Sequence, residues 1–93
     1  MRSTTYKYAV QPGEMRLDLP RGARFLSVDT QGIGIKERPQ MWFLIDLDAE
    51  TECRNFVVFG TGRPVPEPHR LTHLGTFQID NGNLVFHLFE VIP

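Results

Sequence analysis

The sequence predicts an all-β fold, a small antiparallel sandwich or barrel of about six strands. Aromatic residues make up 11% of the 93 residues, and this content favours strands. Eight glycines and seven prolines leave no room for long uninterrupted helices. Short apolar runs separated by turn signals recur about every 8–12 residues, as in small β domains. The length corresponds to one domain, residues 1–93.

The first half of the chain contains four of the expected strands. Turn signals that include Pro12 and Pro20 end the first two. Apolar and charged residues alternate along the second strand, which predicts one buried face and one wet face. Residues 31–39 are expected to form an exposed loop or a wide hairpin turn. The four strands are residues 6–10, 14–19, 24–30 and 40–48.

A fifth strand, residues 53–60, leads into an irregular segment. Residues 60–73 contain Pro64, Pro66 and Pro68, and proline cannot donate to the ladder of a sheet. We therefore predict a proline-rich loop over residues 60–73, with at most one helical turn near residues 67–71.

The chain closes with a hairpin over residues 74–90, whose turn is Asn81-Gly82. Both central residues of a type I′ turn need positive φ, which Asn and Gly tolerate. Both faces of the last strand are largely apolar, so we expect cover on both sides of the hairpin. Alternation places Leu84, Phe86 and Leu88 on one face and Val85, His87 and Phe89 on the other.

Composition excludes several classes of function. A net charge of -1 makes a nucleic-acid partner unlikely, since such proteins usually carry a basic excess. The single cysteine, Cys53, excludes an internal disulfide and fits a reducing compartment. No apolar run reaches the roughly 20 residues of a membrane span, and the start lacks a signal-peptide core. We therefore expect a cytoplasmic protein without a membrane partner.

The first candidate site is the loop Gly60-Thr61-Gly62-Arg63. Its backbone N–H groups and the Arg63 guanidinium could bind an anion, although no P-loop motif follows. The alternative is that the two glycines only let the chain leave its strand, and this weighs about two to one against a ligand site. The tentative ligand-binding set is Arg54, Gly60, Thr61, Gly62, Arg63, His69 and Arg70.

Metal and catalytic sites have little support in the sequence. His69, His73 and His87 could bind zinc, but no cysteine or carboxylate completes a recognisable ligand pattern. Cys53 has no marked partner, and no serine stands in a nucleophile motif. We expect no metal, no cofactor and no enzymatic activity.

Acidic residues alternate near the end of the fourth strand. Asp46, Asp48 and Glu50 could hold calcium, but Thr51 stands where a calcium-binding loop needs glycine. A strand end with its wet face outward is the simpler interpretation. Asp46 could instead pair with Arg54, because the fourth and fifth strands are expected to run antiparallel.

The fourth and fifth strands also carry a large aromatic content. Trp42, Phe43 and Phe56 belong either to the core or to a subunit interface. Strands with two apolar faces in a thin domain need cover, which a second copy can supply. These three residues are the tentative interface, and we expect a homo-oligomer.

The chain contains the blocks Gly60-Thr61-Gly62, Leu74-Gly75-Thr76-Phe77-Gln78 and Val85-Phe86-His87-Leu88-Phe89-Glu90. With these blocks it resembles a family of short uncharacterised proteins of bacteriophage and prophage genomes. The likeness runs from Tyr6 to Glu90, but Arg63 replaces a histidine of the family pattern and Glu50 a proline. It implies a phage context, in the cytoplasm of an infected cell, and no activity. Its most specific parts are Gly60-Thr61-Gly62 and Leu74-Gly75-Thr76-Phe77.

Two main functions remain open, and a hydrolase that uses His69 or His73 as its base is a third, weaker option. The first is a non-enzymatic phage-encoded accessory protein that binds a host or phage protein, for example as an antagonist of a host defence system. The second is a protein that binds or sequesters a small anionic, nucleotide-like molecule through the Gly60–Arg63 loop.

Overall fold

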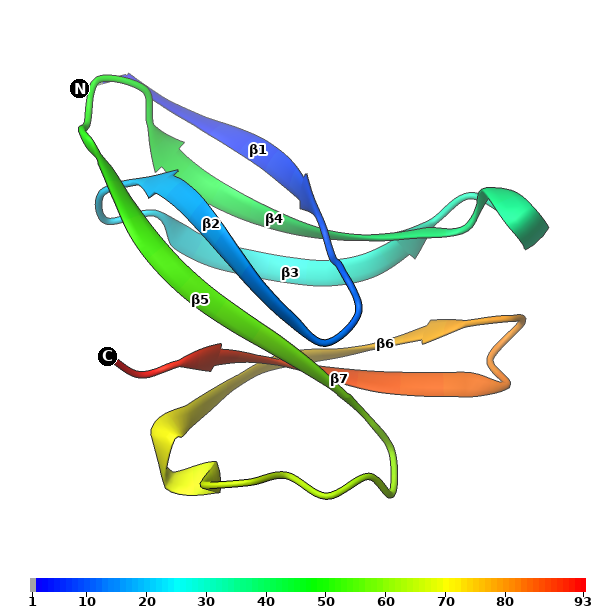
Figure 1. Ribbon diagram of the computed structural model, residues 1–93. Coiled ribbons are helices and arrows are strands. Elements are labelled where there is room, and N and C mark those ends of the chain that lie inside the picture. The colour runs from blue at the N-terminus through cyan, green and yellow to red at the C-terminus, as the bar shows by residue number, and fades with distance from the viewer. Residues whose placement is uncertain (1) are drawn as a thin grey trace.

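The computed structural model describes residues 2–93 as an all-β domain, which confirms the predicted fold class (Figure 1). Within residues 2–93 the only helical segments are two 3-10 turns, η1 (Gly34–Lys36) and η2 (Pro68–Arg70). The seven strands are β1 (Ser3–Ala9), β2 (Glu14–Pro20), β3 (Arg24–Gln31), β4 (Arg38–Asp46), β5 (Thr51–Gly60), β6 (Leu71–Ile79) and β7 (Leu84–Val91).

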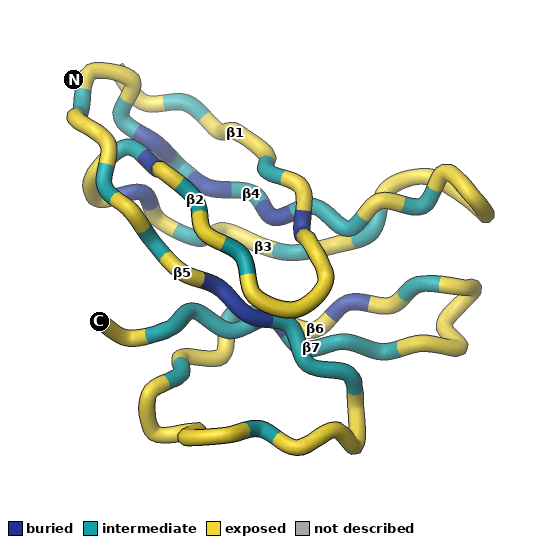
Figure 2. Tube along the Cα trace, viewed as in Figure 1, coloured by how far each residue is buried: buried dark blue, intermediate teal, exposed yellow. Residues whose placement is uncertain are grey.

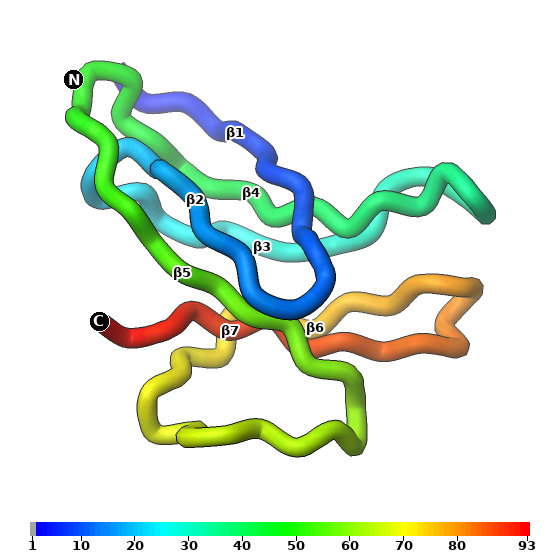
Figure 3. The backbone as a smooth tube through the Cα atoms, in the orientation of Figure 1, coloured from blue at the N-terminus to red at the C-terminus, as the bar shows by residue number. Residues whose placement is uncertain are grey.

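The strands form two antiparallel sheets that pack as a sandwich (Figure 1). The three-stranded sheet has the order β1-β4-β3, and the four-stranded sheet has the order β2-β5-β7-β6. Two pairs of consecutive strands, β3–β4 and β6–β7, are hairpins. The connections β1–β2, β2–β3 and β4–β5 pass from one sheet to the other, as the continuous trace in Figure 3 shows.

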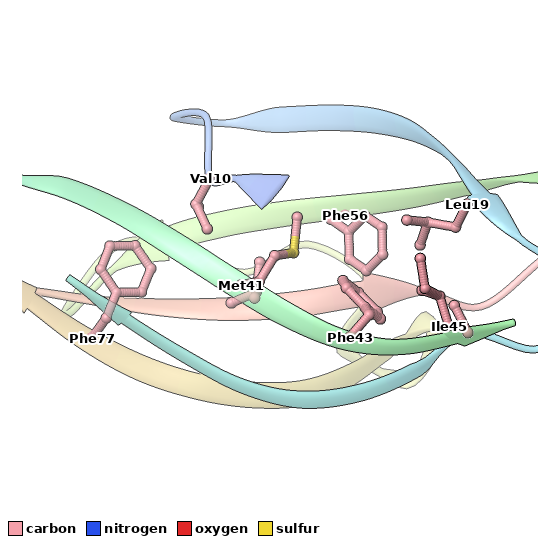
Figure 4. Close-up of a cluster of buried hydrophobic side chains, with 9 residues drawn as sticks. Val10, Leu19, Met41, Phe43, Ile45, Phe56 and Phe77 are labelled. Atoms are coloured by element: carbon pink, nitrogen blue, oxygen red, sulfur yellow. The ribbon is translucent and has the colours of Figure 1, made fainter. Parts of the chain in front are cut away.

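The core lies between the two sheets, where buried segments of β4 and β5 face each other (Figure 2). Alternation explains the pattern, since every second residue of β4 is buried. The ring of Phe43 meets the rings of Phe25 and Phe56 edge-on, at centroid distances of 5.7 and 6.0 Å. The side chains that fill the space between the sheets are labelled in Figure 4 and include Val10, Leu19, Met41, Ile45 and Phe77.

Burial corrects the predicted subunit interface. Phe43 is 0% exposed and Phe56 is 1% exposed, so both belong to the core and cannot meet a second copy. Trp42 points the other way and is partly exposed on the outer face of the three-stranded sheet. The core interpretation therefore holds for Phe43 and Phe56, and the subunit interface stays a prediction for Trp42 alone.

Strands β3 and β6 close one side of the sandwich. Gly75 lies so near β3 that a Cβ there would stand 2.7 Å from Cγ1 of Val28. The hydroxyl of Thr30 donates to the carbonyl of Gln78 at 2.5 Å. A side chain at position 75 would push the two sheets apart here, so glycine is required by packing.

Arg54 lies between the sheets and pairs with Glu90, not with Asp46. Its Nε and Nη2 donate to the two carboxylate oxygens of Glu90 at 2.7 and 2.8 Å, and Nη1 donates to the carbonyl of Ala23. The guanidinium also lies 5.5 Å from the centroid of Phe43. The predicted Asp46–Arg54 pair is wrong because β4 and β5 belong to different sheets.

Several segment boundaries differ from the predictions: β1 is Ser3–Ala9 where residues 6–10 were predicted, and β4 is Arg38–Asp46 where residues 40–48 were predicted. Strand β6 begins at Leu71, so the irregular segment is shorter than residues 60–73. The predicted helical turn is present as η2. At the β6–β7 turn Asn81 and Gly82 have φ of 58° and 85°, which confirms the predicted positive values.

Candidate functional site

The connection between β5 and β6 passes β7, the strand that lies between them in the four-stranded sheet. Both strands pair antiparallel with β7, so they run parallel to each other on its two sides. The chain between them, residues 61–70, passes on the side of the four-stranded sheet away from the three-stranded sheet (Figure 1). All its residues are exposed except Val65, which is partly buried. We call this segment the crossover loop.

The outer face of the four-stranded sheet, on the same side as the crossover loop, carries aromatic rings. Phe59 of β5 lies 5.9 Å from Phe89 of β7, centroid to centroid. His73 of β6 lies 5.2 Å from Phe89 and 6.2 Å from His87. These four residues form a continuous row across three strands, which we call the aromatic strip.

Hydrogen bonds tie the aromatic strip to the first residue of the crossover loop. Nε2 of His87 lies 2.8 Å from the hydroxyl of Thr61, and Nδ1 of His87 lies 3.0 Å from the hydroxyl of Thr76. Nε2 of His73 lies 3.4 Å from the same Thr76 hydroxyl. The two histidines and two threonines, which we call the His–Thr network, therefore span the loop, β7 and β6.

Two directions of donation fit the distances in the His–Thr network. If the hydroxyl of Thr61 donates to the carbonyl of Val85 at 3.3 Å, it accepts from Nε2–H of His87, and Thr76 donates to Nδ1 of His87. If Thr61 instead donates to Nε2 of His87 at 2.8 Å, Nδ1–H of His87 donates to Thr76. In both cases Nε2 of His73 is the ring nitrogen that meets Thr76, and Nδ1 of His73 has no partner within residues 2–93.

The predicted Gly60–Arg63 loop forms a tight turn at this place. The N–H of Arg63 donates to the carbonyl of Gly60 at 3.1 Å, and Gly62 has φ of 85°. The glycine at position 62 therefore has the conformational role that the alternative interpretation gave it. A groove of about 660 Å³ lies beside the turn, lined by Gly60, Thr61, Arg63, Asn83, Leu84, Val85 and Phe86.

Charge at the turn comes from one arginine. Arg63 is exposed and has no ion-pair partner within residues 2–93. The N–H of Gly62 makes no hydrogen bond within the same range. A guanidinium and a free backbone N–H side by side are suited to binding an anion.

The other predicted ligand-binding residues are not all brought together. Arg54 lies on the inner face of β5, six residues before Gly60, or about 20 Å along the strand. Its guanidinium is held by Glu90, whose hydrogen bonds raise the pKa of Arg54 above its ordinary value. His69 and Arg70 stand in η2, at the far end of the crossover loop, where Arg70 lies 3.9 Å from Glu67.

Acidic residues of the β4–β5 region serve the fold. A carboxylate oxygen of Asp46 accepts from the N–H of Asp48 at 2.9 Å, and Asp48 pairs with Arg2. Glu52 accepts from the N–H of Gly22 at 3.0 Å. Across residues 2–93 no three histidine, cysteine or acidic side chains are placed to hold a metal ion together.

A sequence comparison assigns the family. The whole chain, residues 1–93, matches the family described as Domain of unknown function (DUF7352). The chain belongs to the DUF7352 family. No curated protein and no solved structure matches it. Since the family description names no activity, the chemistry of this DUF7352 domain has to be argued from its own side chains.

Four residues of the candidate site lie outside the predicted ligand-binding set, although His73 and His87 were considered as zinc ligands: His73, Thr76, His87 and Phe89. A signal for two of them was present in the sequence. Once the turn is placed at Asn81-Gly82, the register of the hairpin puts Thr76 opposite His87. Across residues 2–93 this DUF7352 domain also has no helix of the length and apolarity that a membrane crossing requires.

Proposed function

We propose that this DUF7352 domain is a non-enzymatic protein that binds a small anionic molecule beside the Gly60–Arg63 turn. One observation carries the proposal: Thr61, the first residue of the turn, is hydrogen-bonded to His87, so the loop and the His–Thr network share one surface. Arg63 and the N–H of Gly62 supply the donors for the anion.

The state of His87 supports binding over catalysis. A general base needs a ring nitrogen free to take a proton from its substrate. Both ring nitrogens of His87 are already engaged by threonine hydroxyls at 2.8 and 3.0 Å. The ring is held in one orientation, as suits a wall of a binding site.

A phage context follows from the resemblance noted above. In that setting the protein would act in the cytoplasm of an infected cell. Sequestering a small anionic molecule would be one way for it to antagonise a host defence system. This part of the proposal rests on the resemblance alone, since the family description carries no such information.

Thermal unfolding in the presence of anions tests the proposal. A ligand that binds only the folded state raises the melting temperature, and the rise grows with ligand concentration. We expect such a rise with phosphate-bearing compounds, and its loss in Arg63→Ala. Arg21→Ala removes an exposed arginine from the β2–β3 turn and serves as the matched control. Equal behaviour of the two variants would contradict a site at Arg63.

A second function, binding of a protein partner, is favoured by the tip of the β3–β4 connection. Ile33 is 89% exposed and Ile35 is 93% exposed, on either side of Gly34. This connection protrudes from the end of the sandwich (Figure 1). Two neighbouring apolar side chains in water are unusual unless another surface covers them.

Solution mass tests that second function. If the tip with Ile33 and Ile35 packs against a second copy of the chain, light scattering should give a mass of two or more chains. The double variant Ile33→Ser/Ile35→Ser should then give the mass of one chain. Leu47→Ser, at a position 49% exposed in the β4–β5 connection, is the control. A mass of one chain for the unaltered protein would argue against the homo-oligomer.

A further inference from the structure

The aromatic strip is not explained by the packing of the two sheets. In an antiparallel sandwich the outward positions of a strand are usually polar, and the inward positions fill the core. Here Phe59, His73, His87 and Phe89 all face outward, and their rings touch in sequence at 5.2 to 6.2 Å. His73 is exposed and the other three are partly exposed. Water therefore reaches part of each of these side chains.

The aromatic strip and the anion-binding turn are adjacent. Phe59 pairs with His87 in the ladder, and the next residue of β5 is Gly60, where the turn begins. Phe89 lies two residues beyond His87 on the same face of β7, or about 7 Å along the strand. The Gly60–Arg63 turn therefore begins directly after Phe59, and its Thr61 contacts His87, so the turn borders one end of the aromatic strip.

The geometry points to a nucleotide as the ligand, with its phosphate at Arg63 and its base stacked on the aromatic strip. This inference rests on the proposed function and names the class of its ligand. Aromatic side chains stack on any base, since every base has a π-face. The arginine fork matches the oxygens of a phosphate. Nδ1 of His73, unpaired within residues 2–93, is available to the edge of the base.

Two observations favour a free nucleotide over a nucleic-acid strand. The net charge of -1 gives no extended basic track for a phosphate backbone. The crossover loop starts after Gly60, which pairs with Phe86 of β7, and ends before Leu71, which pairs with Val91 at the other end of β7. The loop lies on the outer side of the sheet, where a long nucleic-acid strand would also have to lie (Figure 1). A single nucleotide needs only one end of this face.

Calorimetric titration with a graded series of ligands tests the inference. The series is inorganic phosphate, ribose 5-phosphate, adenosine and guanosine 5′-monophosphates, and a short single-stranded oligonucleotide. We expect at least one nucleotide to bind about tenfold more tightly than ribose 5-phosphate, because each 1.4 kcal/mol of stacking is tenfold in affinity. The oligonucleotide should bind no more tightly than the nucleotide.

Two variants locate the base. Phe89→Leu keeps an apolar side chain and removes the ring face, so nucleotide affinity should fall to that of ribose 5-phosphate. Trp42→Leu, on the outer face of the other sheet, should leave it unchanged. The melting temperature of each variant without ligand shows that it is folded.

The outcomes separate this inference from the proposed function. Equal affinities for ribose 5-phosphate and the nucleotides would overturn the nucleotide and leave an anion site in place. Failure of every compound to bind would overturn both. Tighter binding of the oligonucleotide would replace the free nucleotide with a nucleic-acid strand.

Discussion

The two faces of the four-stranded sheet carry similar residues in different surroundings. On the inner face Phe56, Phe77 and Leu88 are at most 5% exposed and pack against the three-stranded sheet. On the outer face Phe59 and Phe89 pack on each other and remain partly open to water. The same strands supply both sets, by alternation along β5 and β7.

This difference distinguishes the apolar residues that the packing of the two sheets requires from those that it does not require. The second sheet accounts for the apolar inner face, because burial of those rings drives the packing of the two layers. No second sheet covers the outer face, although Val57 on this face is 7% exposed. The parts of Phe59 and Phe89 that stay open to water are the parts that our proposal assigns to ligand binding.

The largest expected difference is between two phenylalanines. Phe56→Ala should lower the free energy of unfolding by about 4 kcal/mol, since it leaves a cavity in the core. Phe89→Ala should lower it by about 1.5 kcal/mol, because its ring is already partly in water. Urea unfolding followed by circular dichroism measures both. Equal losses would remove the distinction between the two faces.

The inner ion pair should matter more than a surface pair. Arg54→Ala leaves Glu90 without its partner, at side-chain exposures of 18% and 22%, and should cost about 3 kcal/mol. Arg2→Ala breaks the Arg2–Asp48 pair, exposed by 70% and 48%, and should cost about 0.5 kcal/mol. The same urea experiment applies. A small loss for Arg54→Ala would mean that the pair is not part of the core.

The close approach at Gly75 gives a test of sheet packing. Gly75→Ala should cost about 2 kcal/mol, because the new methyl would meet Val28 at 2.7 Å. Adding Val28→Ala removes that contact, so the double variant should lose less than the sum of the two single losses. Additive losses would show that the sheets are further apart at this point.

The smallest expected effect is a pH dependence. Burial, and to a smaller extent the charge of Tyr6, raises the pKa of Tyr8 above its ordinary value of 10.0. The folded state therefore holds this proton more tightly than the unfolded state. The stability that Tyr8 gains from its raised pKa is fully present below about pH 10, and it is lost as the pH rises through the folded-state pKa. Tyr8→Phe should flatten the fall of the melting temperature above pH 10, and Tyr6→Phe, which removes only the smaller cause, should flatten it less.

Local signals in the sequence were sufficient to predict the strands and one hairpin. Asn81-Gly82 required positive φ, and this turn set the register that places Thr76 opposite His87. The partner of Arg54 could not be found in this way. A short connection between two strands fits a hairpin or a change of sheet equally well, and only the packing of the whole chain places Glu90 beside Arg54.

The candidate site was predicted in part, for the same reason. The Gly60–Arg63 turn is visible in the sequence because two glycines follow a strand. That the turn meets His87 depends on β7 pairing between β5 and β6, a long-range arrangement that alternation alone does not specify. Alternation likewise places Phe56 and Phe59 on opposite faces without saying which face meets the second sheet.

Chemical-shift mapping of the backbone amides during titration with a nucleotide tests the central claim most directly. If the outer face of the four-stranded sheet is the binding surface, the signals of Thr61, Arg63, Thr76, His87 and Phe89 should shift, and those of Lys7 and Trp42 on the other outer face should stay in place. Shifts confined to the three-stranded sheet or to the Ile33–Ile35 tip, with none along β7, would contradict it.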